Sequence, residues 1–217
     1  MRIARLHLIT PEPLDEAASV ATAAALAAGA RWVQVRVKGG TDRARWEAVH
    51  PLVARARTLG ATCLVNDRAD VALATAASGV HLGLDDLPVG AVRAVVPAGF
   101  VIGATVRNAE QARRKADEGA DYLGVGPVYA TTTKDGLPPA IGLAGLEAVV
   151  GAVGLPVIAI SGITPARVPE VLAVGAHGVA VVGAVYRHAD PGLATRSLLD
   201  ALGVDGADDT APFPVAH

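Results

Sequence analysis

The segment AVGAHGVAVVG, residues 173–183, runs from the end of an alanine-rich helical pattern through a glycine into a short β-branched run. The same junction occurs upstream as AAGARWVQV (27–35), TLGATCLVN (58–66), ASGVHLG (77–83) and DEGADYLGVG (117–126). A glycine at this place lets a helix end in the left-handed conformation, so the next strand can begin within a few residues. We expect this role for the recurring glycines Gly29, Gly60, Gly79, Gly119 and Gly175.

This repeated unit predicts short strands that alternate with helices along the whole chain. The strands are expected near residues 6–9, 32–37, 62–65, 80–82, 101–104, 122–125, 157–160 and 179–182. The helices are expected at 14–28, 42–59, 70–77, 89–96, 109–118, 143–153, 165–174 and 193–202. Asn108 and Thr164 are candidate N-caps, and Pro165 suits a first helical turn.

The alternation indicates an α/β fold with a parallel sheet, because parallel strands need helical crossovers. At 217 residues, a single closed (β/α)8 TIM barrel fits better than an open flavodoxin-like sheet, which would need a second domain. We expect the barrel to occupy residues 1–203. Residues 204–217 are rich in Asp, Ala and Pro without periodicity and are expected to form a disordered tail.

Composition narrows the classes of partner. The formal net charge of −2 gives no broad attraction to nucleic acid or to an anionic membrane, so any bound anion must be held by a local cluster. No apolar run reaches the length of a membrane span, and the start does not resemble a signal peptide. With Cys63 as the only cysteine, no internal disulfide can form. We expect a soluble, cytoplasmic protein that acts on small molecules, while a homo-oligomeric state stays open.

The polar residues collect just after the predicted strands, where a barrel of this class builds its active site. In the second strand, Gln34, Arg36 and Lys38 alternate with valines, so one face carries an amide and two cations. A solvated edge strand is the alternative interpretation. In a barrel, this face would point inward and toward the open end.

Two aspartates after different strands are candidate metal ligands. Asp67 follows the third strand beside Asn66, and Asp86 follows the fourth. Two carboxylates at one rim could hold Mg²⁺, which completes its coordination with waters and phosphate oxygens. Either aspartate alone would be read as a helix cap or a turn residue. Together with Arg36 and Lys38, they predict a metal–diphosphate site.

Further phosphate contacts are predicted in the later loops. The segment ATTTKDG after the sixth strand offers Thr131, Thr133 and Lys134, although a plain surface loop reads similarly. The segments SGITP and VVGAV bring Gly162, Val182 and Gly183 to the place where such barrels seat a monophosphate. Tight turns would also explain these glycines. The rim therefore predicts two anion sites and two phosphorylated substrates.

In order, these segments resemble the motifs of the thiamine-phosphate synthase family from near the start of the chain to about Arg196. The matching stretches are QVRVK (34–38), NDRAD (66–70), HLGLDD (81–86), GVGP (124–127), TTTK (131–134) and SGI (161–163). The resemblance implies a transferase of thiamine biosynthesis. Such an enzyme joins hydroxymethylpyrimidine diphosphate to hydroxyethylthiazole phosphate, or to its carboxylate, with release of diphosphate.

The resemblance also implies roles for the residues. Asp67 and Asp86 would bind Mg²⁺, while Arg36, Lys38 and Lys134 would stabilise the departing diphosphate. Further residues at the positions that the family uses would contact the substrates; these are Gln34, Asn66, Thr105, Thr131, Thr133, Gly162, Val182 and Gly183.

Several positions depart from the family pattern, which puts substrate identity and turnover in doubt more than the fold. The departures are Val37, Leu84, Arg107 and Ser161, together with Gly183 where serine is common. A related thiazole tautomerase uses the same barrel with a histidine in the strand-six loop, a place taken here by Pro127. A non-catalytic thiamine-phosphate-binding barrel is a further alternative. No histidine has metal-ligand spacing, and His81 is expected to serve packing.

Overall fold

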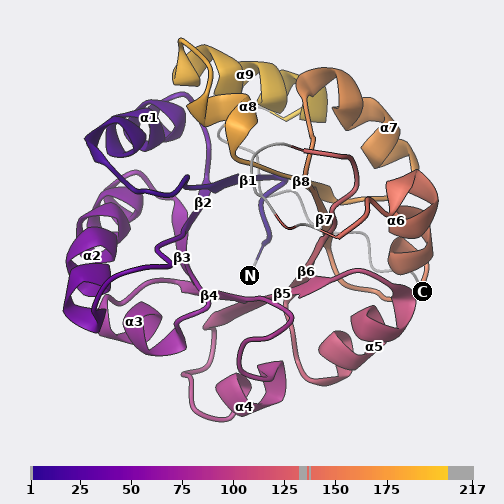
Figure 1. The fold of residues 1–217 in the computed structure, drawn as a ribbon, viewed down its shortest axis with the longest axis horizontal. Coiled ribbons are helices and arrows are strands. Elements are labelled where there is room, and N and C mark those ends of the chain that lie inside the picture. Colours follow the sequence, from indigo (N-terminus) through magenta and orange to yellow (C-terminus); the bar gives the residue numbers. More distant parts are fainter. Residues whose placement is uncertain (1, 132–135, 137, 205–217) are drawn as a thin grey trace.

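Eight parallel strands close into a barrel in the order β1 to β8, as the alternating pattern predicted. The computed structural model describes residues 2–131, 136 and 138–204. In Figure 1 the strands form an inner ring, and the helices form an outer ring around it. The strands are β1 (Leu6–Ile9), β2 (Trp32–Val35), β3 (Thr62–Asn66), β4 (Gly79–Leu82), β5 (Val101–Val106), β6 (Tyr122–Val125), β7 (Val157–Ile160) and β8 (Gly178–Val181).

The helices lie close to their predicted positions. They are α1 (Glu16–Ala27), α2 (Asp42–Thr58), α3 (Ala69–Ala74), α4 (Val89–Arg93), α5 (Ala109–Asp117), α6 (Gly142–Val150), α7 (Val168–Ala173), α8 (Gly183–Tyr186) and α9 (Pro191–Leu202), with a short 3₁₀ turn η1 (Pro165–Arg167) before α7. Asn108 caps α5 through its side chain, as predicted, whereas the Thr164 side chain makes no cap bond. The sequence pattern missed α8, because one helical turn is too short to show periodicity.

Two predictions about the backbone were wrong. The second strand ends at Val35 rather than Val37, so Arg36 and Lys38 lie just beyond it. Gly79 has no left-handed conformation: Ala76 takes it (φ 53°), and Gly79 lies inside β4. An added Cβ at Gly79 would lie 2.1 Å from the Val101 carbonyl oxygen, so close strand packing is the reason for this glycine. The other four glycines of the recurring junction have positive φ, as expected.

The barrel interior holds aromatic rings beside branched aliphatic side chains such as Ile9, Leu64 and Ile158. His7 stacks on Trp32 with 4.5 Å between ring centroids, and Tyr122 meets both edge-on. Gly103 makes room for Tyr122, since an added Cβ would come within 2.4 Å of its ring carbons and hydroxyl. The outward-facing strand residues pack against the helices in a separate, larger apolar cluster. That cluster includes Cys63, which is buried, with its pKa raised to about 12 by burial.

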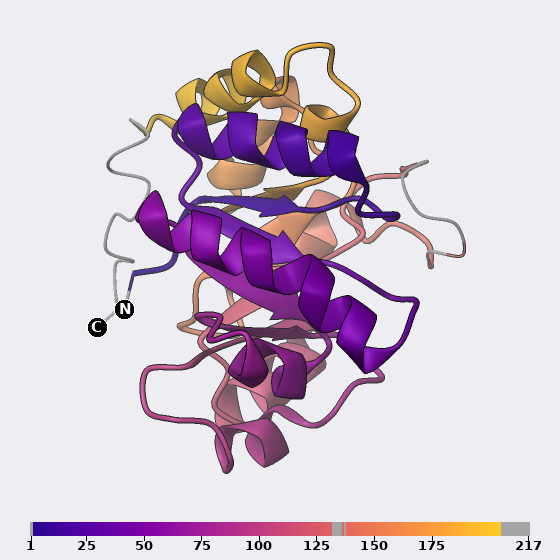
Figure 2. The same ribbon diagram turned by 90° about the vertical axis from the view of Figure 1, so that its left-hand side faces the viewer.

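All strands run the same way, so their carboxyl ends share one face of the barrel. Figure 2 shows the segment after β6 leaving on that face, opposite the N-terminus. The other end is closed by the first residues of the chain, where Arg5 donates to the carbonyl oxygens of His177 and Leu202. Among the helices of the described residues, none combines the length and apolar character that a bilayer crossing requires.

Candidate active site

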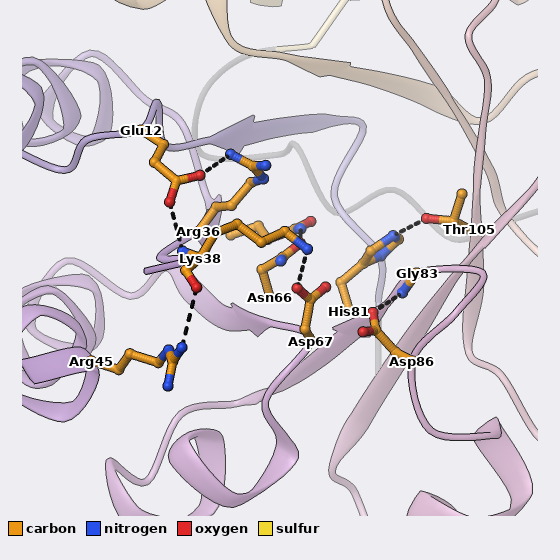
Figure 3. A network of polar contacts seen from close by, with 11 residues as sticks. Glu12, Arg36, Lys38, Arg45, Asn66, Asp67, His81, Gly83, Asp86 and Thr105 are labelled. Carbon is orange, nitrogen blue, oxygen red and sulfur yellow. Dashed lines mark hydrogen bonds and ion pairs between the residues drawn. The ribbon is translucent and has the colours of Figure 1, made fainter. Parts of the chain in front are cut away.

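The predicted polar residues after β2, β3, β4 and β5 meet at the carboxyl ends of these strands. Figure 3 shows the side chains of Arg36, Lys38, Asp67 and Asp86 around a common space, with His81 and Thr105 beside them. They belong to the ends of four neighbouring strands, β2 to β5, and the parallel barrel brings these ends together.

Gln34 and Asn66 form the floor of this site. Both side chains are buried, and Gln34 Nε2 donates to Asn66 Oδ1 at 2.7 Å. The amide nitrogen Nδ2 of Asn66 has no hydrogen-bond partner in the described part of the chain. A buried donor without a partner destabilises a fold unless something else accepts from it. Asn66 Nδ2 is therefore suited to a ligand oxygen.

Asp67 and Asp86 lie together, as their predicted role requires. Asp67 is held in the left-handed conformation at φ 65°, while its backbone N–H donates to the His81 carbonyl oxygen at 2.8 Å. Asp86 accepts from the Gly83 N–H at 2.6 Å. The pKa of Asp86 is raised, first by burial and then by the facing carboxyl of Asp67. A carboxylate whose charge is disfavoured by a facing carboxyl is suited to a cation shared between the two.

Lys38 and Arg36 are both engaged with carboxylates. Lys38 Nζ pairs with Asp67, and Arg36 Nη1 pairs with Glu12 Oε2 at 2.7 Å. The backbone N–H of Lys38 donates to the other oxygen of Glu12 at 2.9 Å. The two cations are thus presented on one side of the aspartate pair, as Figure 3 shows.

Thr105 is linked to the rings inside the barrel. Its hydroxyl lies 2.9 Å from His81 Nε2, and His81 Nδ1 lies 2.8 Å from the Tyr122 hydroxyl. Burial lowers the pKa of His81 to about 4, so the ring stays neutral at pH 7. His81 therefore does more than the packing expected from the sequence, because it also orients a hydroxyl at the rim.

The loop after β7 holds residues of the second predicted anion site. Ser161 and Gly162 both have positive φ, 80° and 70°. Arg167 Nη1 donates to the Gly162 carbonyl oxygen at 2.6 Å, and its guanidinium lies 4.3 Å from the Tyr129 ring centroid. Val182 and Gly183 follow β8, where Gly183 begins α8. Gly162, Val182 and Gly183 would offer backbone groups to a ligand rather than charged side chains.

The strand-six loop is described only in part. Thr131 ends the described segment at that point, and Thr133 and Lys134 lie outside the described residues. Arg107, one of the departures, donates from Nη2 to the Pro139 carbonyl oxygen at 2.9 Å, beyond the gap. It ties the end of β5 to the far end of this loop.

The sequence reasoning missed Glu12 and Thr10, which follow β1 and contact the residues after β2. We looked for site residues among the polar side chains that follow each strand, but only from the second strand onward. The same search would have found both residues after the first strand. Arg45, which donates to the Lys38 carbonyl oxygen at 3.1 Å, had no such signal, because it lies within α2.

The donors present fit a hard divalent cation. Asp67 and Asp86 supply carboxylate oxygens, and no group of three or more His, Cys, Asp or Glu side chains arranged for a metal occurs among the described residues. A cation that uses few protein ligands and keeps substrate oxygens and waters matches such a pair better than Zn²⁺ does.

Comparison with known proteins agrees with this geometry. The family model for thiamine monophosphate synthase matches residues 6–185. A thiamine-phosphate synthase of Salinispora arenicola (strain CNS-205) is 51% identical over 203 residues, which span 92% of this chain and 98% of the relative. One from Methanoculleus marisnigri (strain ATCC 35101 / DSM 1498 / JR1) is 44% identical over 205 residues, spanning 94% and 97%.

A solved structure, the thiamine phosphate pyrophosphorylase from Pyrococcus furiosus, superposes with a TM-score of 0.83 at 37% identity. The superposition covers 92% of this chain and 96% of that one. The matched region spans the barrel and the rim with its aspartates and cations. The chain belongs to the thiamine monophosphate synthase family.

Proposed function

We propose that this chain is a thiamine-phosphate synthase that joins hydroxymethylpyrimidine diphosphate to hydroxyethylthiazole phosphate, or to its carboxylate, and releases diphosphate. The observation that carries the proposal is the joint placement of the Asp67–Asp86 pair and the cations Arg36 and Lys38 at one rim. The names of relatives up to 51% identical support the same activity.

The first substrate would bind at the ends of β2, β3 and β4. Asp67 and Asp86 would hold Mg²⁺, which when bound neutralises charge on the diphosphate and makes it a better leaving group. Arg36 and Lys38 face the same space and would bind the diphosphate oxygens, and Lys134 would join them. The free Nδ2 of Asn66 would donate to the same substrate.

The reaction needs charge stabilisation more than proton transfer. When the carbon–oxygen bond to diphosphate breaks, the electron pair leaves with the diphosphate and positive charge stays on the pyrimidinylmethyl group. The thiazole nitrogen then donates its lone pair to form the new carbon–nitrogen bond. Arg36, Lys38 and Lys134 stabilise the negative charge that develops on the leaving group. The hydroxyl of Thr105, oriented by His81, and the buried Gln34 would line the pyrimidine side.

The second substrate would place its monophosphate at the ends of β7 and β8. Gly162, Val182 and Gly183 present backbone there, and Thr131 and Thr133 would add hydroxyls from the strand-six loop. The charged residues at the first seat and the backbone groups at the second would let the chain distinguish a diphosphate from a monophosphate.

Purified protein with both phosphorylated substrates and Mg²⁺ tests the proposal. We expect thiamine phosphate and diphosphate to form in equal amounts, and their formation to stop when EDTA removes the metal. Product at only the uncatalysed rate would reject the synthase activity. Tautomerisation of the thiazole carboxylate phosphate by the same preparation would instead favour the tautomerase function.

Lys134→Ala tests the contribution of the strand-six loop. Loss of one cation from the leaving group should lower kcat by roughly 100-fold with little effect on folding. Steady-state kinetics and thermal unfolding of the same preparation measure both quantities. Equal kcat in variant and parent would show that Lys134 takes no part in the reaction.

A further inference from the structure

Glu12 connects the two cations of the proposed diphosphate seat. One carboxylate oxygen pairs with Arg36 Nη1 at 2.7 Å, and the other accepts the backbone N–H of Lys38 at 2.9 Å. The pair is partly covered, with 24% of the Arg36 side chain and 33% of the Glu12 side chain exposed. A single side chain thus holds both ends of the segment from Arg36 to Lys38 (Figure 3).

The reason for this contact lies in how β1 ends. Pro11 and Pro13 flank Glu12 and have no N–H to extend the ladder to β2. The last backbone bond runs from the Thr10 N–H to the Gln34 carbonyl oxygen at 3.0 Å. Beyond it, side-chain oxygens replace backbone carbonyls. Thr10 Oγ1 accepts the Arg36 N–H at 2.9 Å, and Glu12 accepts the Lys38 N–H.

Lys38 is held from its other side as well. Its carbonyl oxygen accepts from Arg45 Nη2 at 3.1 Å, while its side chain reaches Asp67. Gly39 and Gly40 follow directly and add no side chain that could hold the segment. The backbone position of Lys38 therefore depends on Glu12 on one side and on Arg45 on the other.

Arg36 keeps donors available for a ligand. Glu12 engages only Nη1, and neither Nε nor Nη2 donates a hydrogen bond to any of the described residues. A guanidinium has five N–H donors in a rigid plane, so fixing one nitrogen orients the rest. Glu12 thereby sets the direction of the unused donors without occupying them.

We propose that Glu12 is a positioning residue that presets Arg36 and Lys38 for the diphosphate substrate. The inference rests on the proposed function, since it assigns a task within the same site. The positioning role and simple electrostatics predict opposite changes in diphosphate affinity when the Glu12 charge is removed. Removing a negative charge beside a polyanion should tighten anion binding by simple electrostatics, whereas loss of positioning should weaken it.

The test compares Glu12→Gln and Glu12→Ala with the parent protein. Glutamine keeps a neutral acceptor for the Lys38 N–H but loses the ion pair, and alanine loses both contacts. Calorimetric titration with inorganic diphosphate in excess Mg²⁺ should show roughly 3-fold weaker binding for glutamine and roughly 10-fold weaker binding for alanine. Glu16→Gln is the matched control, because Glu16 is an exposed carboxylate of α1 that pairs with neither cation.

Steady-state kinetics supply a second measurement, because a general loss of structure would change the KM values of both substrates. The KM for the pyrimidine diphosphate should rise by the same factor in each variant, while the KM for the thiazole phosphate stays within about twofold. Thermal unfolding of each variant verifies the fold. If the alanine variant does not fold, the near-isosteric glutamine variant decides the question.

The outcomes separate the two proposals. Diphosphate binding that is unchanged or tighter in folded Glu12 variants overturns the positioning role and leaves the synthase proposal intact. A parent protein that binds no diphosphate with Mg²⁺ overturns the diphosphate seat itself, and the role of Glu12 with it. Equal rises in both KM values would mean that Glu12 only supports the rim as a whole, which also contradicts the proposal.

Discussion

At the scale of single residues, the rim is a set of charges held in place by specific contacts. Asp86 illustrates this, because its pKa is raised by burial and by Asp67 while the Gly83 N–H and Lys38 act in the opposite direction. The neighbouring Asp85 is exposed. These adjacent aspartates therefore have different surroundings, and substituting each in turn compares a rim carboxylate with an exposed one.

Asp86→Asn should lower activity by about 100-fold or more, because one of two carboxylate ligands for the cation is lost. Asp85→Asn should leave activity within about twofold. Activity as a function of Mg²⁺ concentration is the measurement. Similar losses in the two variants would contradict the assignment of Asp86 as a ligand.

His81 predicts a pH dependence of stability. Burial lowers its pKa from 6.5 to about 4, so the unfolded chain binds a proton that the folded chain does not between these values. The free energy of unfolding should therefore fall as pH drops from about 6.5 to 4, by about 3 kcal/mol from this residue. Other buried histidines, His7 and His177, are shifted the same way.

Urea unfolding of the parent and of His81→Gln across this window isolates the contribution. The variant should show a shallower decrease, because glutamine does not titrate. Identical pH dependence in both proteins would show that His81 is not held neutral in the folded state.

At the scale of elements, the interior rings need space that glycines in the strands provide. Gly103→Ala in β5 would press a Cβ against the Tyr122 ring, which His7, Trp32 and His81 already surround. We expect a loss of about 3 kcal/mol in unfolding free energy. Gly154→Ala, with no atom within 4 Å of the added Cβ, should stay near the parent. Equal stabilities in urea unfolding would refute the packing argument.

The loop after β7 gives a second prediction at this scale. An alanine at Gly162 would place its Cβ 2.7 Å from Tyr129 Cβ and 2.8 Å from the Ala130 carbonyl oxygen. The loop must then shift, so the KM for the thiazole phosphate should rise roughly tenfold, while that for the pyrimidine diphosphate changes little. Gly142→Ala controls for backbone strain, because Gly142 has a similar φ of 66° and open space around it. An equal rise of this KM in Gly142→Ala would show that the clash at Gly162 is not the cause.

At the scale of the whole molecule, the barrel could be predicted because the helix–strand junction repeats along the chain, and repetition is visible without coordinates. The rim residues after β2, β3 and β4 could be placed for the same reason. Glu12 could have been placed at the rim because it follows the first strand, but its contacts depend on how the end of β1 approaches β2. Arg45 could not be assigned from the residue pattern, since it lies within α2 and its contact depends on how the first turns of that helix approach β2. The short α8 and the Gly79 packing contact depend likewise on distances between elements.

The proposed function requires a metal–diphosphate seat and a separate monophosphate seat at one rim. A crystal structure with Mn²⁺, diphosphate and hydroxyethylthiazole phosphate would show both seats. We predict an anomalous peak between Asp67 and Asp86, diphosphate against Arg36 and Lys38, and the thiazole phosphate at Gly162 and Gly183. Metal bound elsewhere, or both anions competing for a single seat, would contradict the account.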